Sequence, residues 1–206
     1  MSVRDAICGF YAVLDRDDPA LARALVGESR VLQVRIKPAA GAVDTGELVR
    51  IARMARRICD DAGAALIVND RVDVALAVDA DGVHLGQTDL SIEDARRIAS
   101  ELWIGVSTHN LDQVRAACEA GADYLGFGPV FATATKANPD PVQGLDGLRA
   151  AVAAASGRPV VAIGGITAGT AGEVYRTGAH AICAIGAVNT AGDPRDAARR
   201  LARPGA

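Results

Sequence analysis

The chain has 206 residues, half of them hydrophobic and 23% of them charged, and its net charge is -3. This composition excludes a disordered chain, and the slightly acidic balance argues against a nucleic-acid-binding or membrane-surface protein. No apolar run approaches the roughly 20 residues of a membrane span, and the first ten residues lack the apolar core of a signal peptide. The four cysteines form no CxxC pair, so we expect buried thiols and a cytoplasmic protein.

Taken in chain order, eight short apolar runs alternate with alanine-rich amphipathic segments. The runs cover residues 9–15, 31–37, 65–70, 82–87, 103–109, 124–131, 159–166 and 181–188, and the clearest helical segments cover 46–62, 92–101, 110–120 and 145–155. Capping residues mark helix starts at Asp44 with Glu47, Ser91 with Asp94 and Thr170 with Glu173, and helix ends at Gly63, Gly121 and Gly178. Eight such units predict an α/β fold, a (β/α)8 TIM barrel forming a single domain over residues 1–206. The alternative, an open doubly wound sheet, requires a glycine-rich turn after the first strand, where the sequence reads YAVLDRDD.

The second predicted strand carries polar side chains on one face. Alternation places Gln33, Arg35 and Lys37 together, and turns the apolar residues between them toward the helices. Cations that point into a barrel need anionic partners. The pattern therefore predicts either a ligand with several negative charges or an internal ion-pair network with acidic residues at the strand ends.

Carboxylates follow the third and fourth predicted strands. Asp70 comes directly after Asn69, and Asp89 follows a Gly-Gln-Thr turn. Because adjacent parallel strands end at the same rim, the two carboxylates are expected to share a Mg²⁺ ion together with phosphate oxygens of a substrate. The alternative for each aspartate is a helix N-cap.

The later strand ends favour phosphate binding. Ser107 can donate a hydrogen bond to a phosphate, whereas His109 is better explained by packing or capping than by catalysis. The glycines at 126 and 128 leave room inside the barrel, and the long connection 131–144 brings hydroxyl donors and a lysine to the rim. Glycines after the seventh and eighth strands, at 164–165 and 186, are typical of the phosphate cradle of a barrel.

Together these motifs resemble those of the thiamine-phosphate synthase family. The matching segments are YAVLD (11–15), QVRIK (33–37), NDRVDVA (69–75), GVHLGQTDL (82–90), GVSTH (105–109), ADYLGFGPVFATATK (122–136), AIGGI (162–166) and AICAIGAV (181–188), in order over nearly the whole chain. The resemblance implies a transferase that joins 4-amino-5-hydroxymethyl-2-methylpyrimidine diphosphate to 4-methyl-5-(2-phosphoethyl)thiazole, giving thiamine monophosphate and diphosphate. It implies loss of diphosphate before the new bond forms, assisted by Mg²⁺.

The resemblance also assigns roles to particular residues. Substrate contacts are expected, on the pyrimidine diphosphate side, from Tyr11, Gln33, Val34, Arg35, Ile36, Lys37, Asn69, Ser107 and Lys136, and, on the thiazole phosphate side, from Thr133, Ala134, Thr135, Gly165, Ile185 and Gly186. Asp70 and Asp89 would hold the metal, and Arg35, Lys37, Ser107 and Lys136 would be catalytic by neutralising the leaving group. The family usually has serine where this chain has Gly186, so one hydroxyl donor is lost there.

Two other functions share parts of this pattern. A thiazole tautomerase-like isomerase would need the thiazole phosphate cradle but no diphosphate site, and a non-catalytic thiazole-phosphate-binding barrel could lose the metal ligands. Retention of both sites favours the synthase. The expected partners are small phosphorylated molecules, with neither nucleic acid nor a membrane, and a homo-oligomer is left open.

Overall fold

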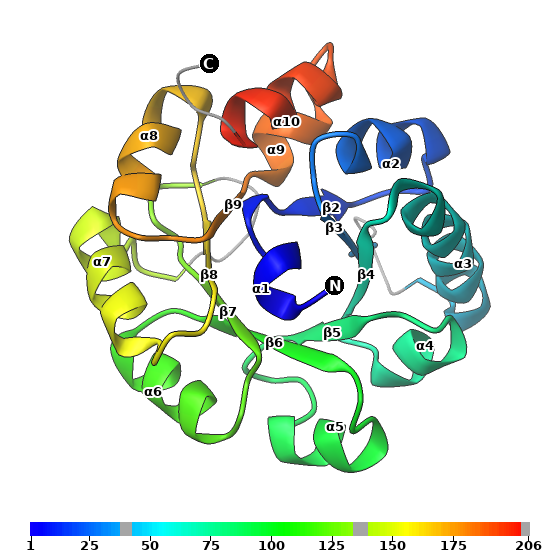
Figure 1. The fold of residues 1–206 in the computed structure, drawn as a ribbon, viewed down its shortest axis with the longest axis horizontal. Helices are drawn as coiled ribbons and strands as arrows, with labels where there is room; N and C mark the ends of the chain where they lie inside the picture. Colours follow the sequence, from blue (N-terminus) through cyan, green and yellow to red (C-terminus); the bar gives the residue numbers. More distant parts are fainter. Residues whose placement is uncertain (38–42, 134–139, 203–206) are drawn as a thin grey trace.

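The computed structural model describes residues 1–37, 43–133 and 140–202. In this part of the chain, nine parallel strands form one sheet that curls into a nearly closed barrel surrounded by helices (Figure 1). The strands are β1 (Gly9–Phe10), β2 (Ala12–Leu14), β3 (Val31–Val34), β4 (Ala65–Asn69), β5 (Gly82–Leu85), β6 (Trp103–Thr108), β7 (Tyr124–Phe127), β8 (Val160–Ile163) and β9 (Ala181–Cys183). Their spatial order is β1-β9-β8-β7-β6-β5-β4-β3-β2.

The first predicted strand is divided between the two edges of the sheet. Tyr11 separates β1, which pairs with β9, from β2, which pairs with β3. Counted as one strand, β1 and β2 complete the eight strands of the predicted barrel. Because every ladder is parallel, each of these eight strands leads to the next through a crossover on the outside. The TIM-barrel prediction is confirmed.

The helices cover the outside of the barrel, apart from the first, which lies within the ring of strands (Figure 1). They are α1 (Val3–Ala6), α2 (Pro19–Val26), α3 (Thr45–Ala62), α4 (Val72–Ala77), α5 (Ile92–Ile98), α6 (Leu111–Glu119), α7 (Gly144–Ala154), α8 (Ala168–Arg176), α9 (Ile185–Asn189) and α10 (Pro194–Ala202). The predicted cap at Ser91 is confirmed, since its hydroxyl accepts from the Asp94 amide. The predicted helix start at Thr170 is wrong, because Thr167 is the N-cap and Thr170 is the third helical residue of its capping box.

Several strands end earlier than predicted. β3 stops at Val34, and β7 stops at Phe127, before a proline that has no amide hydrogen for the ladder. The predicted strand 181–188 is wrong after Cys183, because residues 185–189 form α9. A short run of alanine, isoleucine and valine fits a buried strand and a buried helical turn equally well.

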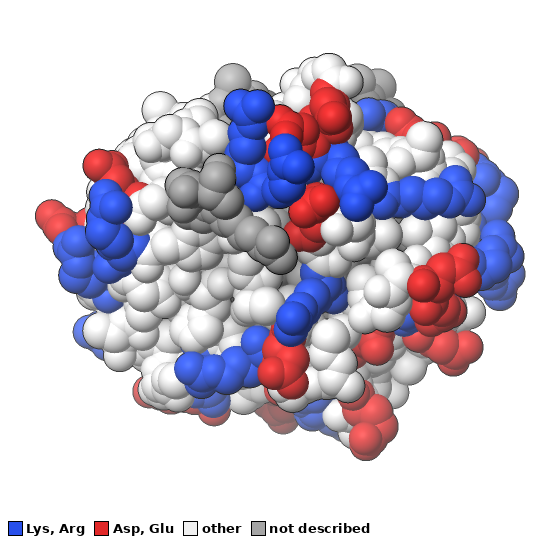
Figure 2. Space-filling view, turned by 45° about the horizontal axis from the view of Figure 1, so that its top comes forward, with Lys and Arg blue, Asp and Glu red and all other residues white. Residues whose placement is uncertain are grey.

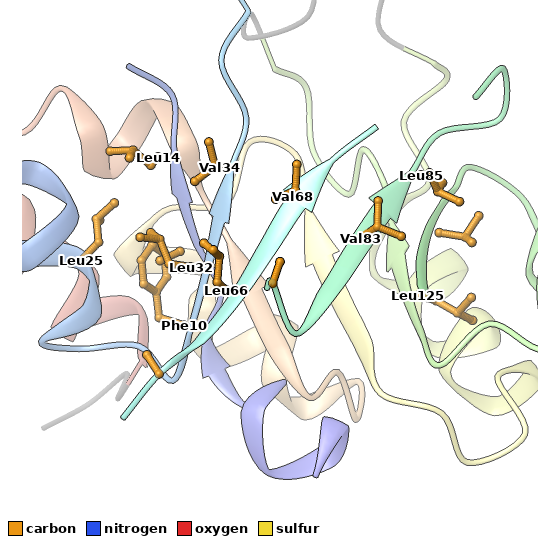
Figure 3. Close-up of a cluster of buried hydrophobic side chains, with 14 of the residues drawn as sticks. Phe10, Leu14, Leu25, Leu32, Val34, Leu66, Val68, Val83, Leu85 and Leu125 are labelled. Atoms are coloured by element: carbon orange, nitrogen blue, oxygen red, sulfur yellow. The ribbon is translucent and has the colours of Figure 1, made fainter. Parts of the chain in front are cut away.

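Two apolar layers hold the barrel together. The side chains that alternate outward from the strands, among them Leu32, Val34, Leu66 and Val83, pack against the helices (Figure 3). A second cluster fills the barrel interior and includes Tyr11, Ile67 and Tyr124, together with Ala6 and Ile7 from α1 and the residue after it. In Figure 1, α1 lies within the ring of strands. It therefore closes the end of the barrel at which the strands begin, and the other end is open for a ligand.

Half-buried arginines stabilise the end of the barrel where the strands begin. Arg56 contacts Asp81 at 2.7 Å, and the same carboxylate oxygen accepts from the Leu66 amide. Arg96 and Asp123 repeat this arrangement around the Ile104 amide one unit further along the sheet. Such pairing at the closed end contributes to stability rather than to chemistry.

Positive and negative side chains are intermixed over the face shown in Figure 2. Many form local pairs on one helix, such as Arg149 with Asp146 at 2.6 Å and Arg115 with Asp112 at 3.2 Å. Exposed pairs of this kind contribute little to stability. Among the described residues, no helix has both the length and the apolar character needed to cross a membrane.

Candidate active site

A cavity of about 750 Å³ lies at the open end of the barrel, where the strands end. It brings together predicted site residues that lie far apart in the sequence: Tyr11, Gln33, Arg35, Lys37, Asn69, Asp70, Asp89, Ser107, Thr133, Gly165, Ile185 and Gly186. The predicted residues Ala134, Thr135 and Lys136 lie outside the described residues. The cavity therefore unites the two expected anion sites, one rich in charge and the other rich in glycine.

The expectation that the Val34 and Ile36 side chains turn toward the helices is confirmed, and their place in the substrate-binding set stays a prediction. Both side chains pack in the apolar layer between barrel and helices, and neither lines the cavity. Successive side chains on an extended segment point to opposite faces, so the residues that line the cavity are the alternate ones, Gln33, Arg35 and Lys37.

The two cations of this segment have different surroundings. The Lys37 Nζ lies 3.4 Å from the Asp70 Oδ2, as the ion-pair alternative predicts. The half-buried Arg35 lines the same cavity, and its guanidinium makes no hydrogen bond or ion pair within the part of the chain that the structure describes. A half-buried guanidinium without a protein acceptor is suited to an anionic ligand.

Asp70 and Asp89 face each other beside Lys37. The Asp70 backbone has a positive φ of 63°, and its amide donates to the His84 carbonyl at 2.8 Å. Asp89 accepts from the Gly86 amide at 2.7 Å. Neither residue is an N-cap, since α4 begins after Arg71 and α5 after Ser91, so the capping alternative is wrong.

The pairing of these carboxyl groups affects their protonation. Burial is the largest cause that raises the pKa of Asp70, its hydrogen bond with Asp89 raises it further, and Lys37 partly opposes the shift. A divalent cation between the two carboxyl groups would offset the unfavourable interaction between their negative charges. The described residues contain no cluster of three or more acidic, histidine or cysteine side chains, so a cation here would draw its other ligands from water and substrate.

A chain of hydrogen bonds crosses the barrel just inside the cavity. The Gln33 Nε2 donates to the Tyr11 hydroxyl at 3.0 Å, and the Tyr11 and Tyr124 hydroxyls are 2.8 Å apart. The Tyr124 hydroxyl lies 3.1 Å from His84 Nδ1, and His84 Nε2 lies 2.9 Å from the Ser107 Oγ. Burial lowers the pKa of His84 to about 4, with Arg35 adding to the effect, so the imidazole is neutral near pH 7.

Sequence reasoning missed His84 and Tyr124 as site residues. The alternation Gly82, His84, Gly86 against Val83 and Leu85 was the signal for an inward-facing histidine. The glycines opposite these rings provide the space for them. A Cβ at Gly126 would lie 3.3 Å from the His84 ring, and one at Gly105 would overlap the Tyr124 ring.

The other side of the cavity is formed by tight turns. Gly164 and Gly165 both have positive φ values, of 103° and 62°. Gly165 is exposed in the cavity wall, and a Cβ on it would overlap the Ala132 carbonyl. Gly128, expected to make room inside the barrel, instead allows close approach to the Ile163 carbonyl, where a Cβ would overlap.

His109 also lines the cavity, but its ring is held by the protein. Its Nδ1 lies 2.6 Å from the Gly128 carbonyl and therefore donates to it, and its Nε2 lies 3.5 Å from an Asp140 oxygen. This supports the prediction that His109 has a packing role.

Comparison with known proteins identifies relatives over most of the chain. The family described as thiamine monophosphate synthase matches residues 10–188. A thiamine-phosphate synthase of Chloroflexus aurantiacus is 49% identical over 178 residues, covering 86% of this chain and 80% of the relative, and one of Geobacillus kaustophilus is 44% identical over 185 residues, covering 88% and 82%. The solved structure of a thiamine phosphate pyrophosphorylase from Pyrococcus furiosus superposes with a TM-score of 0.86 at 42% identity, covering 97% of this chain and 96% of that one.

Proposed function

Because this chain belongs to the thiamine monophosphate synthase family, we propose that its cavity binds the two substrates of a thiamine-phosphate synthase side by side. The activity is that of a transferase, which joins 4-amino-5-hydroxymethyl-2-methylpyrimidine diphosphate to 4-methyl-5-(2-phosphoethyl)thiazole and releases diphosphate. The observation that carries the proposal is the single cavity lined by Arg35, Lys37, Asp70 and Asp89 on one side and by glycine turns on the other.

The charged side of the cavity would take the pyrimidine diphosphate. Arg35, Lys37 and Ser107 are the donors in this region, and Lys136 is proposed to join them from the connection after β7. Tyr11, Gln33 and Asn69 would receive the pyrimidine ring. The glycine side, with Thr133, Gly165, Ile185 and Gly186, would receive the thiazole phosphate, together with Ala134 and Thr135.

A Mg²⁺ ion fits the two facing carboxyl groups. Asp70 and Asp89 supply hard oxygen ligands, and a cation between them would favour the ionised pair and so oppose the raised pKa of Asp70. When bound, the ion would neutralise charge on the diphosphate. The residues around it would orient the diphosphate, and Arg35 and Lys37 would stabilise the charge that grows as it departs.

The bond to diphosphate is proposed to break before the new carbon–nitrogen bond forms. The aminopyrimidine ring can delocalise the positive charge left on its methylene carbon, and the thiazole nitrogen has a free lone pair. The reaction therefore requires no general base for the nucleophile. The chain's task is to hold the two substrates in line and to stabilise the departing anion.

The test of this function is diphosphate release by the purified protein. We expect release that depends on Mg²⁺ and on the presence of both substrates, with equal formation of thiamine monophosphate. Binding of the thiazole phosphate without diphosphate release in the presence of Mg²⁺ would contradict the proposal. It would instead support an isomerase or a binding protein.

Arg35→Met tests the anion-binding role of Arg35. We expect KM for the pyrimidine diphosphate to rise about tenfold or more, because a hydrogen bond to a charged group contributes roughly 1.5–3 kcal/mol. Steady-state kinetics and thermal unfolding would be measured together, with Arg149→Met, a solvent-exposed change on α7, as the control. A loss of stability with KM and kcat both unchanged would assign Arg35 a structural role.

We further propose that the protein works in the cytoplasm on small phosphorylated molecules. All four of its cysteines are free thiols, and Cys59 and Cys183 are buried. Buried thiols without partners are typical of proteins in reducing compartments.

A further inference from the structure

The hydrogen-bond chain from Gln33 to Ser107 contains a residue whose role the proposed chemistry does not explain. Tyr124 is fully buried, and its hydroxyl lies between the Tyr11 hydroxyl and the His84 ring. Its ring is fixed in place, because Gly105 lies directly against it and the Tyr11 and His84 rings flank it at centroid distances of 6.0 and 5.5 Å. The hydroxyl therefore has one fixed position in the interior of the barrel.

With the Gln33 Nε2 facing Tyr11, the hydrogen-bond chain runs in one direction. Each tyrosine hydroxyl has one proton, and a neutral imidazole has one donor and one acceptor nitrogen. Since Gln33 donates to Tyr11, the Tyr11 proton is available for Tyr124. The Tyr124 proton then goes to His84 Nδ1, and His84 Nε2 carries the ring proton and donates to the Ser107 Oγ.

The opposite direction leaves a buried donor unsatisfied. If Tyr124 donated to Tyr11, the Tyr11 oxygen would accept two hydrogen bonds, and its own proton would have no acceptor among the described residues. Tyr11 is only 3% exposed, and Gln33 and Tyr124 are the side chains with which its hydroxyl makes hydrogen bonds in the described part of the chain. A buried hydroxyl proton without an acceptor is costly, which favours the direction from Gln33 to Ser107.

We propose that Tyr124 is a positioning residue that fixes His84 in the Nε2–H tautomer and so leaves the Ser107 hydroxyl free to donate to the anion in the cavity. With His84 donating to its oxygen, Ser107 cannot also give its own proton to the imidazole. That proton is then available to the cavity, which Ser107 lines. The identity of the anion as diphosphate rests on the proposed function. The direction of the hydrogen-bond chain does not.

The ring nitrogens of the wild-type protein provide the first test. ¹⁵N NMR distinguishes a protonated from an unprotonated imidazole nitrogen, and the chain has only three histidines, so His84→Gln assigns the signals. We expect the proton of His84 on Nε2 in the free protein and in the presence of inorganic diphosphate with Mg²⁺. A proton on Nδ1 would overturn the proposal, because Ser107 would then donate to His84.

Tyr124→Phe provides the second test, because it removes the hydroxyl and keeps the ring. We expect kcat to fall about tenfold with KM for both substrates nearly unchanged, since Ser107 keeps its place but loses its fixed orientation. The ¹⁵N signals of His84 should change to those of a mixture of tautomers. An unchanged kcat or an unchanged His84 spectrum would overturn the proposal.

Tyr175→Phe is the matched control. The Tyr175 hydroxyl, on α8, lies 2.8 Å from the Gly9 carbonyl and 3.0 Å from the Leu201 carbonyl, and Tyr175 does not line the cavity. The Tyr175→Phe variant should lose about as much stability as Tyr124→Phe. It should keep full activity and an unchanged His84 spectrum. A wild-type protein that releases no diphosphate would contradict the proposed function alone, because the NMR experiment needs no turnover.

Discussion

Asp70→Asn is expected to lower kcat by about 100-fold or more while making the protein more resistant to heat. The activity falls because the substitution removes one of the two carboxylates proposed to hold Mg²⁺, and loss of one preorganised charge contact costs on the order of 100-fold. Asparagine tolerates the positive φ of 63° at this position, so the backbone need not change. Steady-state kinetics at several Mg²⁺ concentrations would measure the effect.

The expected gain in stability follows from the direction of the Asp70 pKa. Burial and Asp89 raise this pKa above its ordinary value of 3.8, so the folded state holds the proton more tightly than the unfolded state does. Ionised Asp70 therefore lowers the free energy of unfolding at neutral pH. Asp70→Asn should be more stable than the wild type near pH 7 without Mg²⁺, and the difference should vanish as the pH falls below the ordinary value. Added Mg²⁺ should stabilise only the wild type.

Asp73→Asn is the matched control on the neighbouring helix. Asp73 is exposed, and its hydrogen bonds with Arg71 hold its pKa below the ordinary value, which is the opposite direction from Asp70. This variant should keep its activity and its response to Mg²⁺, with no gain in stability. If Asp70→Asn retained normal turnover, or if added Mg²⁺ stabilised it as much as the wild type, the metal-site assignment would be contradicted. No gain in stability at neutral pH without Mg²⁺ would contradict the raised pKa of Asp70 instead.

The sequence predicted the barrel because local patterns determine it. Apolar runs alternating with amphipathic helices recur eight times, with capping residues or glycines at several of the helix ends, and parallel strands then bring all strand ends to one rim. Asp70, Asp89 and Ser107 could be placed there for that reason. The family matches now favour the synthase over the isomerase and the non-catalytic barrel.

Other parts of the site depend on contacts between distant residues. The hydrogen-bond chain joins Gln33 to Tyr11, Tyr124, His84 and Ser107, which lie on different strands, and no short motif reports their distances. The outward direction of the Val34 and Ile36 side chains, by contrast, could be predicted from alternation alone, because successive side chains of an extended segment face opposite ways. Their inclusion in the binding set stays a prediction.

Gly165→Ala is expected to have the largest effect on stability and to weaken thiazole phosphate binding. An alanine at a φ of 62° costs about 1–2 kcal/mol, and its Cβ would overlap backbone and side-chain atoms of the segment 131–132. Overpacking of this kind costs about 1–3 kcal/mol more. The total, about 2–5 kcal/mol, corresponds to a fall in Tm of roughly 4–20 °C for a chain of this size.

Gly63→Ala separates the cost of backbone strain at a positive φ from the cost of the overlapping Cβ. Gly63 has a similar φ of 66° at the end of α3, but a Cβ there would meet nothing within 4 Å. It should therefore lose only about 1–2 kcal/mol and keep its kinetics. Gly165→Ala should in addition raise KM for the thiazole phosphate roughly tenfold, because moving the turn to relieve the overlap displaces the backbone amides proposed to bind the phosphate. Equal losses of stability in the two variants, with an unchanged KM, would show that the turn at Gly165 serves the fold and not the phosphate.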